Sequence, residues 1–463
     1  MGGSNEALRH WFRQGGWTQL ELARAVGRLG RARGYNVAPD SSRVRRWLEG
    51  ERPRHPVPEL VAALFTERVG RPLTPADLGL AAAPTADHVP WDHRALVTTL
   101  QDFTRSDLMI KRRDVLGATA ALATGVVLEG RLAGWLDHAD HADHRHHADA
   151  PPSALGPGRI GTAEIAEIEA ATRTFWAWDA KRGGGLYREA VVGQLKAMTD
   201  LLDHGYPDAI SRRLFRSTAD LARLAGWMSH DVGLQATAQR YFTLALHCAK
   251  RAGDTGLGVE VLSRMARQMV HVGKPREALS LVALARRGAG GRLAPMASAM
   301  LATCESWAHA TLGDVRAVDR AVGVAEAHFS RADPAETPGW LSYFDRAGLE
   351  GMAALSYRTA AEHRPGVELR AEPHLAEALR LRRDTYQRSN LFDVISLVGV
   401  RVLQGEHAEA NRLAAERLTP AGRISSTRTF DRIEALRDRA VADATRSKDA
   451  RLLADTLAAL VAA

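Results

Sequence analysis

Apolar residues and glycines recur at a forty-residue interval through the middle of the chain. Gly233, Gly273 and Gly313 each follow an apolar residue, where a turn would separate two helices. The pattern predicts antiparallel helix pairs that stack into an α-solenoid, most clearly over residues 214–330. The other small and apolar positions that keep this interval are Ala238, Ala278 and Val318; Phe242, Val282 and Val322; and Ala245, Ala285 and Ala325.

The best-defined unit, residues 224–245, resembles the tetratricopeptide repeat, although the link between units is longer than in that family. Gly226 stands at the small position of the motif, and Ala266 and Ser306 replace it in the next two units. The resemblance implies that the first helix of each pair lies on a concave face that receives ligands or peptides. Further helix pairs are expected at 341–389, 391–418 and 424–462.

Two columns of side chains fall on that expected concave face. Arg223, Ser263 and Thr303 form one column. Trp227, Arg267 and Trp307 form the other, in which two tryptophans flank an arginine. Such a set could stack on a planar or apolar ligand while the guanidinium holds a carboxylate. The alternative is that the tryptophans belong to the core between repeats. The candidate effector-binding residues are Arg223, Trp227, His230, Arg267, His271 and Trp307.

Helical periodicity also marks the amino-terminal part of the chain, beginning at Thr18. Glu21 follows three residues later, and this spacing predicts a capping box at the start of a helix. In that helix, Leu20, Ala23 and Val26 are expected to point inward. The small alanine would let a second helix cross closely.

A second short helix is expected to end before Gly50 and Pro53. Val44, Trp47 and Leu48 share one face of it by their i, i+3, i+4 spacing and are expected to be buried. Its outer face would then consist of polar residues. These are Ser42, Arg43, Arg45 and Arg46.

Together these two helices resemble the Xre-type, lambda-repressor-like helix-turn-helix. Gln19, Ala23, Trp47, Gly50 and Pro53 match its pattern position by position. The resemblance implies a domain that reads double-stranded DNA. The residues implied to contact DNA are Thr18, Gln19, Ser41, Ser42, Arg43, Arg45 and Arg46.

Charge supports this interpretation of residues 1–80. They hold thirteen arginines against eight acidic residues, a net charge of +5 out of +8 for the whole chain. Such a concentration suits phosphate binding. The stretch 27–43, however, is longer than the short turn that such domains use, which leaves the groove geometry open. A basic helical bundle with no nucleic-acid partner is the alternative.

Residues 81–159 are expected to connect the two domains. The stretch 111–128 looks like a twin-arginine export signal, but it lies inside the chain and its apolar run is shorter than the ~20 residues a membrane span needs. A buried helix is therefore expected there. The His/Asp-rich tract 137–152 is expected to be a linker, with weak metal binding through His138, His141 and His144 as the alternative. No metal site and no cofactor are predicted.

Composition and motifs exclude several other classes. Aromatic residues make up only 6% of the chain, which favours helix over sheet. Cys248 and Cys304 lack metal-ligand spacing, and the amino terminus lacks a signal pattern, so a cytoplasmic protein without membrane contact is expected. Catalytic motifs are absent, and residues 183–185, three glycines, are expected to form a flexible turn. An enzyme is not predicted.

The order of these parts is similar to a large family of regulators from high-GC, sporulating, antibiotic-producing bacteria. The match covers most of the chain, and residues 224–242 are its most specific part. It implies an all-α transcriptional regulator, often a repressor of development or secondary metabolism. The expected parts are a helix-turn-helix domain (1–80), connecting helices and linker (81–159) and tetratricopeptide-like helix pairs forming an α-solenoid (160–463).

The partners implied by this resemblance are double-stranded DNA and a second copy of the chain in a homodimer, with a small-molecule or peptide effector as a further candidate. A protein of another class fits the same pattern. In that alternative the chain is a protein-interaction adaptor, whose repeats capture a partner and whose basic front end binds no specific DNA sequence.

Overall fold

A computed structural model of the protein describes residues 5–32, 35, 37–51, 53, 56–69, 75, 78–80, 93–109, 122–123, 128, 132–136, 160–291 and 293–462. These residues contain helices and no strand, which confirms the all-α expectation. The expected helix at 111–128, apart from residues 122, 123 and 128, and the tract 137–152 lie outside the described residues. None of the described helices is long and apolar enough to span a membrane.

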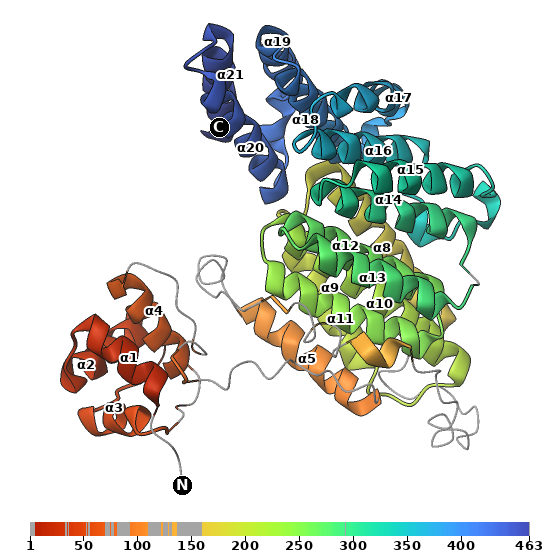
Figure 1. Ribbon diagram of the computed structural model, residues 1–463. Helices are drawn as coiled ribbons and strands as arrows, with labels where there is room; N and C mark the ends of the chain where they lie inside the picture. Colours follow the sequence, from red (N-terminus) through yellow and green to blue (C-terminus); the bar gives the residue numbers. More distant parts are fainter. Residues whose placement is uncertain are drawn as a thin grey trace. The chain divides into compact units, whose positions relative to one another are not determined.

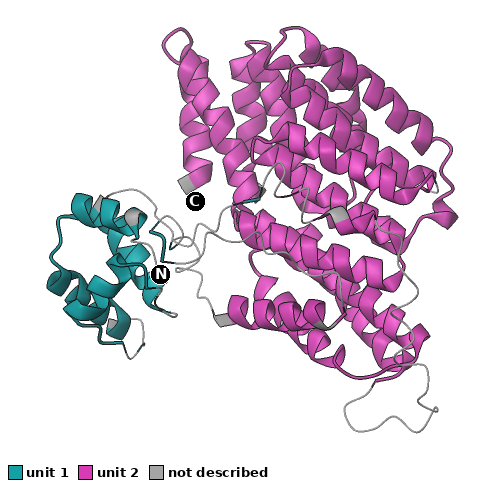
Figure 2. Ribbon diagram, turned by 60° about the horizontal axis from the view of Figure 1, so that its bottom comes forward, with its two compact units in different colours: residues 1–88, 109–123 teal, residues 89–108, 124–463 magenta. Residues whose placement is uncertain are grey.

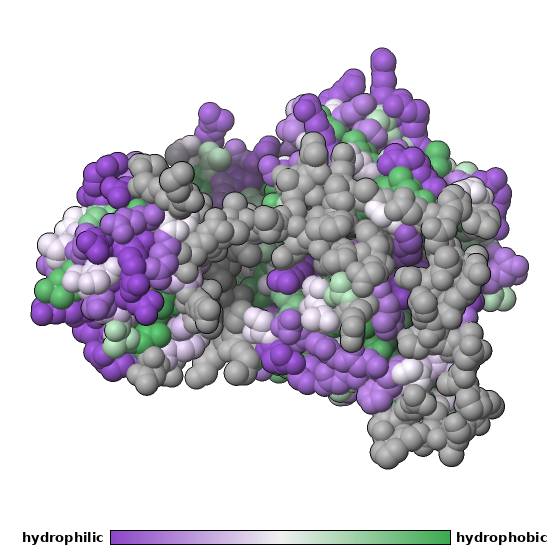
Figure 3. Space-filling view, turned by 90° about the horizontal axis from the view of Figure 1, so that it is seen from below, coloured by the Kyte–Doolittle hydropathy of each residue, from purple (hydrophilic) through white to green (hydrophobic). Residues whose placement is uncertain are grey.

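The chain divides into two compact units (Figure 2). The first holds residues 1–88 and 109–123, and the second holds residues 89–108 and 124–463. On the face drawn in Figure 3, the described surface is mainly hydrophilic, with apolar residues in small scattered areas. Such a surface is expected where helices bury their apolar sides in a core.

In the described part of the first unit, four helices pack around one apolar core (Figure 1). The helices are α1 (Glu6–Gly15), α2 (Gln19–Ala32), α3 (Ser41–Leu48) and α4 (Val57–Val69). The fully buried apolar residues at its centre are Leu8, Leu22, Val26, Val44, Leu60, Val61, Phe65, Leu78 and Leu80.

The expected capping box at the start of α2 is confirmed. The backbone N–H of Glu21 donates to Oγ1 of Thr18 at 3.2 Å, and the backbone N–H of Thr18 donates to Oε2 of Glu21 at 2.8 Å. One inward position was wrong, because Leu20 is 48% exposed while Leu22 is fully buried. At about 100° per residue, Leu20 lies roughly 160° around the helix from Leu22, so the two cannot both face the core.

The long stretch after Val26 is explained by a longer helix. Helix α2 continues to Ala32, so part of the extra length is helical and the link to α3 is shorter than the sequence suggested. The chain then returns across α2 at Gly30, where a Cβ atom would overlap the side chain of Val37. The backbone N–H of Tyr35 donates to the Gly30 carbonyl at 2.9 Å and helps to close this turn.

The second unit is an array of helix pairs, and three described α-helices precede the first pair (Figure 1). The preceding helices are α5 (His93–Met109), α8 (Thr162–Arg182) and α9 (Arg188–Leu201). In each later pair the two helices pack against each other. The pairs are α10 (Asp208–Asp231) with α11 (Gln235–Ala252), α12 (Thr255–His271) with α13 (Pro275–Ala289), α14 (Pro295–Thr311) with α15 (Val315–Phe329), α16 (Arg346–Ala361) with α17 (Ala371–Leu381), α18 (Gln387–Leu403) with α19 (His407–Arg417), and α20 (Thr427–Asp443) with α21 (Lys448–Ala462).

The forty-residue interval corresponds to these pairs. Gly233, Gly273 and Gly313 each lie in the turn inside a pair, with φ angles of 85°, 74° and 77°. Gly405 makes the same turn between α18 and α19, with a φ of 76°. Residues other than glycine rarely adopt this left-handed conformation, so the glycine is required by the turn itself.

The small position of the motif also has a packing reason. A Cβ atom on Gly226 would lie 2.8 Å from the ring of Phe242 in the facing helix, so only glycine fits beside that ring. The first pair therefore keeps its close spacing because glycine leaves room for the aromatic ring.

Helix α8 and the first helices of the next five pairs close into a ring. Each of α8, α10, α12, α14, α16 and α18 contacts the next, and α18 contacts α8. Arg388 at the start of α18 donates to both carboxylate oxygens of Asp179 on α8, at 3.0 and 2.7 Å. The side of the first helices that would be open in an extended solenoid is therefore largely an interior here.

The three glycines at 183–185 belong to this closure and are not a loose turn. The backbone of Ser425 exchanges two hydrogen bonds with Arg182 and Gly185, at 2.9 and 3.1 Å. A Cβ atom on Gly184 would lie 2.7 Å from the Cα of Met228. The expectation of flexibility was wrong because these glycines allow three backbone segments to approach closely.

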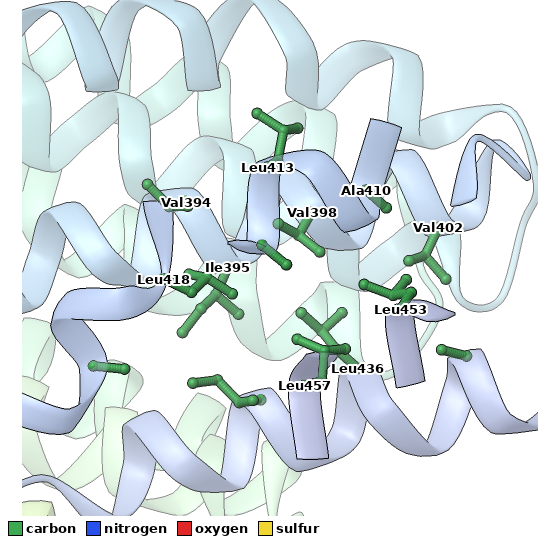
Figure 4. Close-up of a cluster of buried hydrophobic side chains, with 14 of the residues drawn as sticks. Val394, Ile395, Val398, Val402, Ala410, Leu413, Leu418, Leu436, Leu453 and Leu457 are labelled. Atoms are coloured by element: carbon green, nitrogen blue, oxygen red, sulfur yellow. The ribbon is translucent and has the colours of Figure 1, made fainter. Parts of the chain in front are cut away.

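A separate apolar cluster stabilises the carboxyl-terminal end of the array (Figure 4). It is formed by α18, α19, α20 and α21. The labelled residues include Val394, Val398, Leu413, Leu436 and Leu453, which are all buried. Because α20 is anchored in this way, its first turns are held against the ring.

Candidate nucleic-acid interface and arginine cluster

Helix α3 presents a polar outer face, as the sequence predicted. Val44, Trp47 and Leu48 are buried, with 0%, 2% and 7% of their surface exposed. Ser42 is exposed and Ser41 is half-buried. The arginine side chains on the outer face are 56% exposed for Arg43, 64% for Arg45 and 46% for Arg46.

The three arginines lie beside two glutamates that follow the helix. Arg43 and Arg46 are 3.6 and 3.3 Å from the carboxylate of Glu51, and Arg45 is 3.8 Å from that of Glu49. Exposed pairs of this kind contribute about 0–1 kcal/mol each to stability, so they are easily exchanged. The guanidinium groups are thus available to a phosphate, although the two carboxylates weaken the local positive field.

The start of each helix in this part of the unit is fixed by a cap. Oδ1 of Asp40 accepts from the backbone N–H of Arg43 at 2.8 Å and so positions α3. Thr18 is exposed, Gln19 is half-buried, and the Thr18 hydroxyl donates to Glu21 at 2.8 Å. The backbone and hydroxyl hydrogen bonds from Thr18 lower the pKa of Glu21. Thr18 therefore serves first as a cap residue.

The residues expected on an open concave face of the array are mostly buried, which corrects that expectation. Arg223 is 1% exposed and pairs with Asp220 at 2.6 Å and Glu260 at 2.7 Å. Trp227 is 6% exposed, with the guanidinium carbons of Arg264 and Arg428 at 4.3 and 4.4 Å from its ring centroid. The reason is the closed ring, since charged side chains inside it must pair with one another.

Two histidines from neighbouring first helices meet inside the ring. Nδ1 of His230 lies 2.8 Å from Oε1 of Gln235, and the ring packs edge-on against His271, with centroids 5.1 Å apart. Burial and the nearby Arg428 hold the pKa of His230 well below its usual range. Burial also lowers the pKa of His271, whose Nε2 lies 3.5 Å from Asp431.

A fully buried aspartate, which the sequence did not reveal as a site residue, is the centre of the polar interior. Oδ1 of Asp231 accepts from Ser426 at 2.9 Å and twice from Arg428, at 2.9 and 2.7 Å. Its Oδ2 accepts from the backbone of Gly184 at 2.9 Å and from Arg388 at 3.0 Å. Burial acts to raise the pKa of Asp231, but the two guanidinium groups hold it well below its usual range.

The sequence does contain a signal for this centre. Asp231 is the last residue of α10, whereas Arg388 and Arg428 lie in the first turns of α18 and α20. Each charge stands at the helix end where the macrodipole disfavours it. Charges in such positions indicate partners elsewhere in the fold.

Two arginines of the interior have no carboxylate partner among the described residues. Nε of Arg267 donates to Sγ of Cys304 at 3.4 Å, and its Nη2 is enclosed without a hydrogen-bond acceptor. Arg432 lies over the ring of Phe392, 4.1 Å from its centroid, and 6.0 Å from that of Trp307. Both arginines and Trp307 keep part of their surface exposed.

The electrostatic position of Arg432 is unfavourable. Burial lowers the pKa of Arg432, and the nearby cations Arg428 and Arg358 lower it further. Removing a charge from water costs on the order of several kcal/mol, whereas contact with an aromatic ring returns about 0.5–2 kcal/mol. Aromatic contacts alone therefore do not compensate the burial of Arg432.

Comparison with known protein families gives a match in the amino-terminal part of the chain. A family model described as the SP15 N-terminal domain matches residues 8–81. This region coincides with most of the small helical bundle. No match was found among curated proteins or among solved structures.

Proposed function

We propose that this protein is a DNA-binding transcriptional regulator, with α3 as the helix that contacts the major groove. The observation that carries the proposal is the outer face of α3, where Ser42, Arg43, Arg45 and Arg46 are exposed on a helix whose other face is buried. A recognition helix needs this combination of a fixed inner face and polar residues that reach base edges and phosphates. Proteins of this type usually act as dimers on paired half-sites, so we propose a homodimer.

The proposal is tested by measuring the DNA affinity of the full chain. Duplexes would be selected by the full-length protein from a random library, and binding measured by fluorescence anisotropy at several salt concentrations. We expect the double variant Arg43→Ala, Arg46→Ala to bind at least about tenfold more weakly, since base or phosphate contacts contribute roughly 1–3 kcal/mol each. The slope of log K against log salt should fall by about two.

Two further variants sharpen the result. Glu51→Gln removes the carboxylate shared by Arg43 and Arg46, so it should strengthen binding. The control Arg276→Ala, Arg287→Ala removes the same charge from exposed positions on α13 and should leave the affinity unchanged. Equal losses in the α3 variant and this control would mean that overall charge, and not α3, determines binding.

A further inference from the structure

We propose that the array binds a small organic anion beside α12, α14 and α20, with its carboxylate or phosphate oxygens held by Arg267 and Arg432 and its apolar part against Trp307. This site lies within the second unit alone, so the inference does not depend on DNA binding. It would give the array a ligand, and with it a sensing function.

The pairing of charges in the ring interior carries the proposal. Arg223 and Arg264 share Glu260, with hydrogen bonds of 2.7 Å each. Arg388 and Arg428 share Asp231. These two carboxylates thus pair with four arginines, whereas Arg267 and Arg432 have no described carboxylate at ion-pair distance and contact a sulfur atom and aromatic rings.

The contacts of the two arginines place them at adjacent turns. Arg267 on α12 contacts Cys304 on α14, and Trp307 lies one turn further along α14. Arg432 on α20 approaches the ring of Trp307. Next to it, Asp431 pairs with His271, which lies one turn after Arg267 on α12. The two cations therefore both lie next to the same short part of α14, around Cys304 and Trp307.

The kind of ligand follows from these groups. Guanidinium groups bind carboxylate and phosphate oxygens through paired hydrogen bonds. Trp307 provides a partly exposed indole beside them, and an aromatic face favours a flat apolar group. An organic anion that combines both features fits better than a simple inorganic ion.

The anchoring of α20 indicates that the proposed site is preformed. Arg428, one turn before Arg432, donates two hydrogen bonds to Oδ1 of Asp231, from Nε at 2.9 Å and from Nη2 at 2.7 Å. The other end of α20 is held by the apolar cluster around Leu436. Arg432 is therefore presented from a helix that is anchored on both sides of it.

The test is a thermal melt of the full chain with phenyl phosphate, inorganic phosphate or phenol at matched ionic strength. We expect phenyl phosphate to raise the Tm of the array by roughly 2–5 °C at saturation. Inorganic phosphate should raise it less, and phenol should have no effect. The variant Arg43→Ala, Arg46→Ala should show the same shifts, which separates this site from the DNA-binding face.

Variants of the two arginines decide between a ligand site and a structural role. Arg432→Met should keep or raise the Tm without ligand, because it removes a charge that lies near other cations and has no described ion-pair partner, and Arg267→Met and Arg432→Met should both abolish the phenyl phosphate shift. The matched control Arg428→Met, one turn away on α20, should lower the Tm because it deprives Asp231 of a partner. The proposal is overturned if no anion raises the Tm of the unmodified chain, if the shift survives in both variants, or if both variants lose stability as Arg428→Met does.

Discussion

At the scale of single residues, the interior of the array shows which buried charges are compensated and which are not. Asp231 accepts five hydrogen bonds from Ser426, Arg428, Gly184 and Arg388. His230 is buried beside cations and its pKa is lowered well below the usual range, which keeps it neutral. Asp231 is thus paired and His230 neutral, whereas Arg267 and Arg432 have no described carboxylate at ion-pair distance.

Replacement of Asp231 should show how much the array depends on this centre. Asp231→Asn would leave Arg388 and Arg428 without their shared charge, and breaking a buried pair in this way costs about 3–5 kcal/mol. The free energy of unfolding of the array, measured by urea titration, should fall by that amount. Asp208→Asn on the same helix is the control, because Asp208 is exposed and its pair with Arg212 contributes little. Equal effects of the two substitutions would disprove the central role of Asp231.

The same centre gives a pH dependence with a definite sign. Its two arginines hold the pKa of Asp231 below the usual 3.8, so the unfolded chain takes up this proton first as the pH falls. The stability contributed by Asp231 is complete above pH 3.8 and is lost progressively below it. Urea titrations across this range should show a steep acid loss in the unmodified chain and a smaller one in Asp231→Asn.

At the scale of helices, the sequence predicted what depends on local spacing and missed what depends on distant contacts. The helix pairs followed from glycines such as Gly233, because the turn itself requires a left-handed residue. The outer face of α3 followed from the spacing of Val44, Trp47 and Leu48. The closed ring could not be predicted from the sequence, because it depends on the hydrogen bond between Arg388 and Asp179, which lies 209 residues earlier in the chain. The burial of Arg223 and Trp227 is a consequence of that closure.

One element, the segment 132–136, is held in the array by a slot that glycines create. The indole of Trp135 occupies space where a Cβ atom on Gly258 of α12 or Gly288 of α13 would overlap it, and Lys250 donates to the Gly134 carbonyl. Leu132 is also fully buried. The docking of this segment is therefore sensitive to a single methyl group.

Gly258→Ala should expel Trp135 from its slot. Overpacking costs about 1–3 kcal/mol, whereas alanine returns only up to about 1 kcal/mol of helix propensity. Hydrogen exchange of residues 132–136 should accelerate strongly. Gly323→Ala on α15 has open space around its Cβ and should leave the exchange unchanged. Slow exchange at 132–136 in Gly258→Ala would show that the slot does not hold the segment.

At the scale of the whole molecule, the two compact units carry two separate proposals. The first unit has the exposed arginines of α3 and most of the net positive charge expected for nucleic-acid binding. The second unit has a closed ring in which, among the described residues, Arg267 and Arg432 have no carboxylate at ion-pair distance. A regulator that senses an organic anion and binds DNA needs both units. Either proposal can be disproved without affecting the other.

The most direct measurement of the central claim is photo-crosslinking of the full chain to a selected duplex. A benzophenone side chain would be placed at Ser42, on the exposed face of α3, and at Arg287 on α13 as the control. We predict a specific crosslink to DNA from position 42, lost in excess unlabelled duplex of the same sequence, and none from position 287. No crosslink from position 42, or an equal yield from position 287, would contradict the account.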